Sequence, residues 1–174
     1  MNIVLIGYRG TGKSVVGELL AKRLIMKYVG MDAQIIESAR MTIPEIVEKY
    51  DWTGFRDRET AVAQELSGRD NLVIDTGGGV IERPENMKIL GQKARIFWLK
   101  ASVNTIVSRI QSDTQRPALV EGKTFTEEVA EVLERRIPKY KSAAHHEIDT
   151  DDLTPEEVAD MIVTILRQKN AVTV

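Results

Sequence analysis

The chain has 174 residues, of which 43% are hydrophobic and 29% are charged, a balance that is typical of one globular domain and argues against disorder. A formal net charge of -2 at pH 7 gives no reason to expect a nucleic-acid partner, and the lack of cysteine excludes disulfides and thiolate sites. The apolar runs are strand-sized, far shorter than the roughly 20 residues of a membrane helix, and no basic leader precedes the first glycine loop. We therefore expect one monomeric, cytoplasmic domain over residues 1–174, with no membrane partner.

Short β-branched segments alternate with amphipathic segments of helical length along the chain. The expected strands lie at residues 2–6, 27–31, 71–75, 94–99 and 146–149. The expected helices lie at residues 13–25, 43–50, 55–66, 84–90, 103–110, 126–143 and 155–167. This alternation predicts an α/β fold in which helices cover both faces of a parallel sheet.

Two segments fit the alternation poorly. Residues 33–54 carry additional short helices, and the polar residues 111–124, which include Pro117 and Gly122, are expected to form a loop. Neither an internal repeat nor a linker divides the chain. Both segments are therefore expected to be functional insertions in one domain.

Residues 7–14, Gly-Tyr-Arg-Gly-Thr-Gly-Lys-Ser, match the phosphate-binding pattern G-x-x-x-x-G-K-[ST], called the P-loop. The segment follows the first apolar strand and opens the first amphipathic helix, a context that a chance glycine-rich turn lacks. Lys13 is expected to reach the terminal phosphates of a nucleotide, and the Ser14 hydroxyl is expected to join a Mg²⁺ shell. Backbone N–H groups that can turn toward phosphates belong to Gly10, Thr11 and Gly12.

A P-loop alone is shared by GTPases, ATPases and small-molecule kinases. Residues 75–78, Asp-Thr-Gly-Gly, fit the D-x-x-G pattern of GTPases, but the guanine-reading pattern N-K-x-D occurs nowhere in the chain. A signalling GTPase is therefore not expected, and the residues that could bind an acceptor become more informative.

Three arginines outside the P-loop can meet an anion. Arg56 and Glu59 lie three residues apart on an expected helix and can pair, although such a pair is more often a solvated surface feature. Arg136 falls on the apolar face of the helix at 126–143, where burial requires either a bound anion or a structural salt bridge. Arg116 stands in the polar loop, where it can stabilise a transferring phosphoryl group or simply be solvated.

Together these motifs resemble those of the shikimate kinase family, and the match runs through nearly the whole chain. The matching elements are the P-loop, Asp32, Phe55-Arg56-x-x-Glu59, Thr76-Gly77-Gly78-Gly79, Arg116-Pro117-x-Leu119 and Arg135-Arg136-x-Pro138-x-Tyr140. The resemblance implies a three-layer P-loop kinase fold, like that of the nucleoside monophosphate kinases, with a five-stranded parallel sheet of order 2-3-1-4-5. It also implies an acceptor-binding insertion at residues 32–60 and a lid at residues 111–124.

The same resemblance implies that ATP phosphorylates shikimate to shikimate 3-phosphate, an early step toward the aromatic amino acids. Arg56 and Arg136 would hold the substrate carboxylate, with Glu59 bracing Arg56. Asp32 would orient the attacking hydroxyl and is the candidate to deprotonate it. The glycines that would let the backbone approach the substrate ring closely are Gly77, Gly78 and Gly79.

On the nucleotide side, the resemblance implies that Lys13 and Arg116 contact the phosphates. Arg116 would reach them from the closing lid, which would also exclude water. Arg109 and Pro155 would flank the adenine ring. The implied catalytic residues are Lys13, Asp32 and Arg116.

One departure from the family pattern concerns the metal. The family usually carries two aspartates, spaced D-x-D, after the second strand, whereas this chain has Gly30-Met31-Asp32, so the metal-directing aspartate is absent. Asp75 ends the third strand, where P-loop enzymes often hold magnesium through a carboxylate. We expect Asp75 to replace the missing carboxylate and to bind the metal with Ser14; the alternative is that Asp75 only caps the turn.

Two other functions remain open from the sequence. A kinase for another anionic polyol, such as a gluconate-type sugar acid, would share the P-loop and differ in acceptor specificity. A nucleotide-binding module without activity would fit the substitution at Gly30, and it would bind ATP without acceptor-dependent ADP release. The residues that argue for activity are Lys13, Asp32, Arg56, Arg116 and Arg136.

Overall fold

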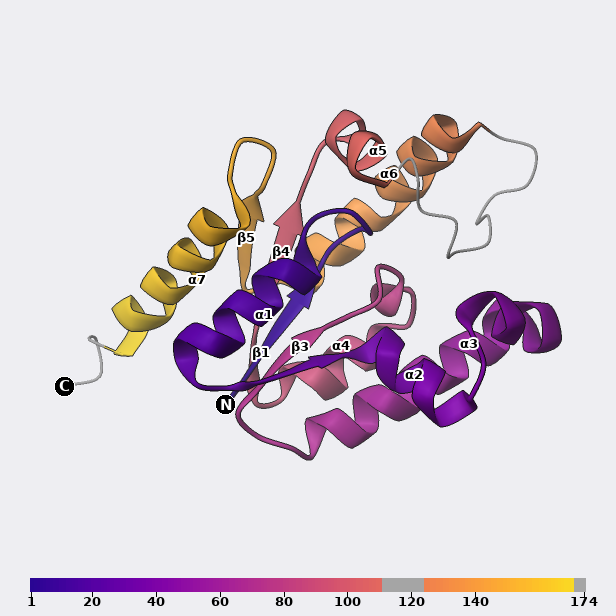
Figure 1. Ribbon diagram of the computed structural model, residues 1–174, viewed down its shortest axis with the longest axis horizontal. Helices are drawn as coiled ribbons and strands as arrows, with labels where there is room; N and C mark the ends of the chain where they lie inside the picture. The colour runs from indigo at the N-terminus through magenta and orange to yellow at the C-terminus, as the bar shows by residue number, and fades with distance from the viewer. Residues whose placement is uncertain (111–123, 171–174) are drawn as a thin grey trace.

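Five parallel strands form one sheet in the order β2-β3-β1-β4-β5 (Figure 1). The computed structural model describes residues 1–110 and 124–170. The strands are β1 (Asn2–Ile6), β2 (Lys27–Gly30), β3 (Leu72–Asp75), β4 (Ala94–Lys100) and β5 (His146–Asp149). The order confirms the 2-3-1-4-5 topology implied by the motifs, and each strand lies within two residues of its predicted bounds.

Strand β1 runs through the centre of the sheet and is buried on both faces. Its alternate residues Ile3 and Leu5 face one apolar cluster, and Val4 and Ile6 face the other. None of the four is more than 1% exposed, which is the pattern of a parallel sheet covered by helices on both sides.

One face of the sheet is covered by α1 (Lys13–Leu24) and α7 (Pro155–Asn170), which lie side by side (Figure 1). Val16 and Leu20 of α1 and Ile162 of α7 pack with Leu5 in this layer. The opposite face is covered by α3 (Ile43–Ser67), α4 (Pro84–Gly91) and α6 (Phe125–Ala143). The fold is therefore the expected three-layer arrangement.

Helix α3 contains the two helices predicted at residues 43–50 and 55–66. The two segments join into one long element across a kink at Asp51, where the backbone leaves helical geometry at φ 55° and ψ -175°. The Asp51 carboxylate accepts the N–H groups of Thr53 at 2.6 Å and Gly54 at 3.2 Å, so it caps the second half. Helix α2 (Met31–Ala39) precedes α3 and accounts for the extra helical content expected near residue 33.

Helix α5 (Val103–Ile110) and α6 stand on either side of residues 111–123, at the upper edge in Figure 1. The predicted loop, with Arg116 and Pro117, lies outside the described residues. Thr124, at its end, forms a capping box with Glu127 that starts α6. Among residues 1–110 and 124–170, no helix combines the length and apolar character that a bilayer crossing requires.

Candidate active site

The P-loop turns from the carboxyl end of β1 into the N-terminus of α1. Gly12 adopts a left-handed conformation, φ 89°, directly before Lys13, which favours glycine and lets α1 start at once. The Lys13 ammonium donates to the carbonyls of Gly7 at 2.9 Å and Tyr8 at 3.0 Å. Lys13 is therefore folded over its own loop, on the side where helix N-terminal N–H groups favour an anion.

Thr11 supports the loop. Its hydroxyl donates to the Tyr8 carbonyl at 2.8 Å and the residue is 2% exposed. The side chain thus stabilises the loop conformation, and the expected contact with a nucleotide can come only from the backbone N–H group.

A cavity of about 460 Å³ opens beside the P-loop at the carboxyl edge of the sheet. This is the edge at which open parallel sheets bind ligands. The predicted site residues that line the cavity are Gly10, Gly12, Lys13, Ser14, Asp32 and Asp75. The structure therefore brings the phosphate-binding loop, the predicted metal ligands and the predicted substrate aspartate to one place.

Ser14 and Asp75 are in direct contact. The Ser14 hydroxyl donates to Asp75 Oδ2 at 2.6 Å, and the Tyr28 hydroxyl donates to the same oxygen at 3.0 Å. Burial, together with the nearby Asp75 carboxylate, raises the pKa of Tyr28, so this phenol stays protonated and can donate. Gly30 is the register partner of Asp75 on the neighbouring strand, so Asp75 stands beside the position where the family pattern has its metal-directing aspartate.

The donor set fits a magnesium ion. Mg²⁺ takes hard oxygen ligands and is bound by one or two carboxylates, with water and phosphates completing the shell. Because the Ser14 hydroxyl is the donor in its hydrogen bond to Asp75, the lone pairs of Ser14 Oγ remain available to a metal. In the described part of the chain no group of three or more His, Cys, Asp or Glu could hold a metal ion by itself.

Arg56 is fixed from several sides. It donates to Glu59 Oε2 at 2.7 Å, and its guanidinium lies over the rings of Trp52 and Phe55 at 5.5 and 5.2 Å. A Cβ at Gly79 would overlap this guanidinium. Glu59 is buried and the Arg56 side chain is only 12% exposed, so the pair is not a solvated surface pair.

Glu59 is wholly buried, and burial raises its pKa while the positive charge of Arg56 opposes that rise. The positive charge of Arg136 also opposes the rise in the Glu59 pKa. One Glu59 oxygen, Oε1, has no hydrogen-bond partner among the described residues. The Glu59 carboxylate thus serves as the buried partner of Arg56.

The triple glycine lets protein groups converge. A Cβ at Gly77 would lie 2.9 Å from Glu59 Oε1 and 3.0 Å from Asp32 Oδ1. A Cβ at Gly78 would lie 3.2 Å from the Arg9 backbone nitrogen. The absence of side chains here therefore brings the two carboxylates and the P-loop together. Close approach to a substrate ring stays a prediction.

Arg136 projects inward from α6, as its position on the apolar face predicts, and is 4% exposed. Its Nε donates to Glu82 Oε1 at 2.7 Å. Glu82 also accepts from Lys139, and from Arg135 at 3.3 Å. Burial alone would raise the pKa of Glu82, but the hydrogen bonds and charges of Lys139 and Arg136 lower it to about 2.

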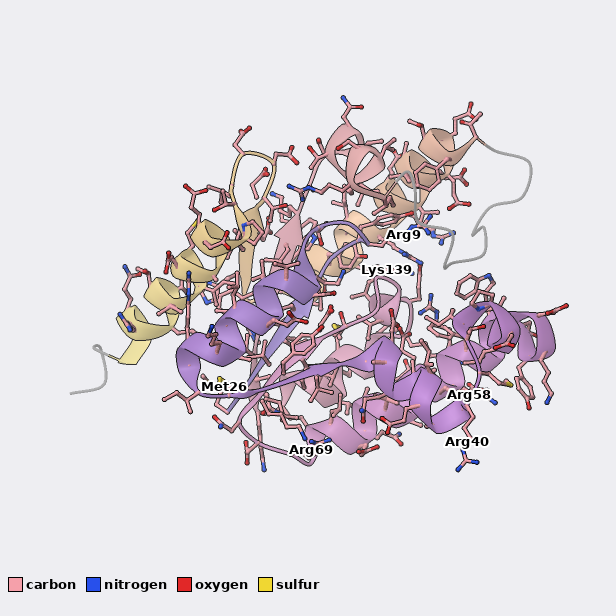
Figure 2. All side chains as sticks on the ribbon, in the orientation of Figure 1. Arg9, Met26, Arg40, Arg58, Arg69 and Lys139 are labelled. Carbon is pink, nitrogen blue, oxygen red and sulfur yellow. The ribbon has the colours of Figure 1, made fainter. Side chains whose placement is uncertain are left out.

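Arg9 joins the P-loop to α6. Its guanidinium lies 3.4 Å from Glu128 Oε1 and 5.4 Å from the centre of the Phe125 ring. Figure 2 shows Arg9 and Lys139 near the middle of the view, whereas Arg58 lies out on the α2 and α3 side. The basic residues on the α6 side of the site are thus held by acidic partners on neighbouring elements.

Arg109 connects α5 to the P-loop and to the segment after β5. From α5 it donates to the Gly10 carbonyl at 3.2 Å and to the Thr150 carbonyl at 3.0 Å. Pro155 begins α7 shortly after Thr150, so α5 and the start of α7 approach the P-loop together. The expected adenine contacts of Arg109 and Pro155 stay predictions.

The sequence analysis missed two polar residues of the site. Glu82 is separated by 54 positions from Arg136, and Tyr28 by 47 from Asp75, so helical spacing could not pair them. Strand register gives a partial signal, because residue 28 lies two positions before Gly30 on the same face of β2.

Comparisons with known proteins agree with this geometry. The family model described as Shikimate kinase matches residues 9–167. A shikimate kinase from Thermodesulfovibrio yellowstonii is 44% identical over 162 residues, covering 93% of this chain and 92% of that protein. The solved structure of shikimate kinase from Acinetobacter baumannii in complex with shikimate superposes with a TM-score of 0.92 at 34% identity, covering 97% of this chain and 93% of that chain. A gluconokinase from Sinorhizobium meliloti, at 15% identity and a TM-score of 0.59, shares the fold alone.

Proposed function

The chain belongs to the shikimate kinase family, and we propose that it transfers the terminal phosphoryl group of ATP to shikimate, giving ADP and shikimate 3-phosphate. The observation that carries this proposal is that Arg56, packed on Gly79, and Arg136, bonded to Glu82, both reach the segment at residues 79–82, next to Gly78, which approaches the P-loop backbone. Planar guanidinium groups suit a carboxylate, and shikimate carries one. The rival acceptor, an open-chain sugar acid, is supported by a likeness of fold only.

Asp32 is proposed to aim the acceptor. It lines the phosphate cavity and lies close to Gly77. In the reaction the substrate hydroxyl oxygen bonds to the γ-phosphorus, the bond from that phosphorus to the bridging oxygen of ADP breaks, and Asp32 takes the hydroxyl proton. Positioning of this kind provides most of the rate in phosphoryl transfer, because the protein supplies little covalent chemistry.

Ser14 and Asp75 are proposed to hold Mg²⁺. When bound, the ion neutralises charge on the phosphate oxygens. Their contact at 2.6 Å places a hydroxyl and a carboxylate together in the cavity. Asp75 would then do from β3 what the family aspartate, absent at Gly30, does from β2.

The remaining nucleotide contacts follow the family pattern. Lys13 would reach the terminal phosphates and Arg109 and Pro155 would flank the adenine, while Arg116, outside the described residues, would act from the lid. The lid at 111–124 and the acceptor insertion at 32–60 are part of this proposal, as are a monomeric state and a cytoplasmic location.

The test is ADP release from ATP and Mg²⁺ with shikimate, with gluconate, and without acceptor. We expect release that depends on shikimate and not on gluconate. Release with gluconate alone would replace the acceptor assignment, and ATP binding without acceptor-dependent release would identify a nucleotide-binding module. Lys13→Ala protein, prepared in parallel, controls for contaminating kinases.

A further inference from the structure

We propose that Tyr28 is a positioning residue that fixes the orientation of Asp75 for metal binding, through its hydroxyl bond to Asp75 Oδ2 and the space left by Gly30. The inference rests on the proposed function, because it assigns a supporting residue to the same magnesium site. It extends the site from the residues that touch the metal to a residue that acts through one of them.

The placement of Tyr28 follows from strand register. Tyr28 pairs with Val73 and Gly30 pairs with Asp75 in the parallel ladder of β2 and β3. Tyr28 and Gly30 lie on the same face of β2, so the Tyr28 ring reaches diagonally across to Asp75, a distance that aromatic side chains span. The ring is seated against α1, where a Cβ at Gly17 would lie 2.8 Å from a ring carbon. Gly17 therefore makes the room that fixes the ring.

Gly30 is not required by its backbone. Its φ of -89° and ψ of 121° are open to any residue. A Cβ there would meet the Tyr28 hydroxyl at 3.5 Å, an ordinary contact. A longer side chain at residue 30 would grow toward Asp75 and the Tyr28 hydroxyl, so the glycine leaves that space to the hydroxyl. Gly30, Tyr28 and Asp75 thus form one arrangement in which the carboxylate comes from β3.

The hydrogen bonds distinguish the two oxygens of the Asp75 carboxylate. Ser14 and Tyr28 both donate to Oδ2 of Asp75, and neither hydroxyl engages Oδ1. Two donors from different elements fix the rotation of a carboxylate far better than one. Without the Tyr28 hydroxyl, Asp75 would be held only by Ser14, whose oxygen is itself a proposed metal ligand.

The experiment measures metal binding directly. Mn²⁺ is titrated into the ADP complex and free Mn²⁺ is followed by electron paramagnetic resonance, for wild type, Tyr28→Phe, Asp75→Asn and the double variant. We expect Tyr28→Phe to weaken Mn²⁺ binding about fivefold, within the range seen for residues that orient metal ligands. In the Asp75→Asn background the second change should have no further effect, because Tyr28 acts through Asp75.

Tyr50→Phe, a matched change on α3, is the control and should bind Mn²⁺ as wild type does; Tyr50 is 39% exposed and its ring contacts only charged side chains of its own helix among the interactions described. Unchanged Mn²⁺ affinity in Tyr28→Phe would overturn the inference. An equal loss with and without Asp75 would do the same, since it would mean a general structural role. Failure of the proposed function would look different. If ADP release did not depend on shikimate but Tyr28→Phe still weakened Mn²⁺ binding, the role of Tyr28 would stand and the assignment of shikimate as acceptor would fall.

Discussion

The site has a phosphate side, formed by the P-loop, and an acceptor side, around Arg56 and Arg136, and the two differ in which parts of the chain form them. The phosphate side relies on the backbone: left-handed glycines, a helix N-terminus and one lysine that bonds to carbonyls of its own loop. The acceptor side relies on side chains from distant elements, where Arg56 is paired with Glu59 and Arg136 with Glu82. The phosphate-binding backbone is formed by consecutive residues, whereas the orientation of each arginine depends on a partner that the folded chain brings next to it. Perturbing the two sides should therefore give different kinetic signatures.

Lys13→Ala should give the largest effect, because it removes the P-loop side chain that is proposed to reach the terminal phosphates. We expect turnover to fall about 1000-fold, in line with the loss of a preorganised donor to transition-state charge. The rate of ADP release at saturating shikimate measures it. Lys22→Ala, on the exposed side of the same helix, should keep wild-type turnover. Substantial turnover by Lys13→Ala would show that the backbone cradle is sufficient.

Arg136→Ala should act on acceptor binding rather than on turnover. Losing one guanidinium contact to a carboxylate should raise KM for shikimate about 30-fold and change kcat by less than about threefold. Arg135→Ala is the control, because Arg135 also contacts Glu82 but its side chain is 56% exposed. An unchanged KM for shikimate in Arg136→Ala would remove this residue from the acceptor site.

Asp75→Asn tests whether the phosphate side also depends on a side chain from a distant strand, the Asp75 carboxylate beside Ser14. We expect the Mg²⁺ concentration for half-maximal rate to rise about twentyfold, as for other losses at a metal site. Adding Gly30→Asp to Asp75→Asn should lower the half-maximal Mg²⁺ concentration most of the way back to the wild-type value, because the two positions are register partners. Full activity and unchanged Mg²⁺ dependence in Asp75→Asn would show that Asp75 only caps the turn and does not bind the metal.

Glu82→Gln should give the smallest effect, on stability. The Glu82 pKa falls from its ordinary value near 4.5 to about 2 in the folded protein, so its ionised form stabilises the fold above pH 4.5 and this contribution is lost as pH falls toward 2. We expect the variant to lose on the order of 1 kcal/mol in free energy of unfolding at pH 7, with the difference vanishing at low pH.

Urea unfolding of wild type and Glu82→Gln between pH 7 and 2.5 measures this difference. Glu85→Gln, exposed on the adjacent helix, provides the matched charge change. A constant difference at all pH values would mean that Glu82 acts by shape and not by charge.

The sequence was sufficient for the fold and for the P-loop, but it did not predict the contact of Tyr28 with Asp75. Alternating apolar segments predicted the strands, and the P-loop pattern placed Lys13 and Ser14 correctly beside the cavity. It also predicted that Arg136 points inward, but the spacing left open what it meets. Its partner Glu82 lies on the short helix η1 (Val80–Glu82), which contacts α6 only in the folded chain. The break between the helices at 43–50 and 55–66 was also predicted, and the structure shows it as the kink at Asp51.

The close packing of Arg56 on Gly79 limits how this site can change under selection by an inhibitor. Any side chain at residue 79 would displace the guanidinium, and one at residue 77 would press on Glu59 and Asp32. A mutation that disturbed an inhibitor from either position would also disturb Arg56, Glu59 or Asp32, the groups proposed to bind the acceptor. Compounds that lie against these two glycines should therefore meet few viable resistance mutations there.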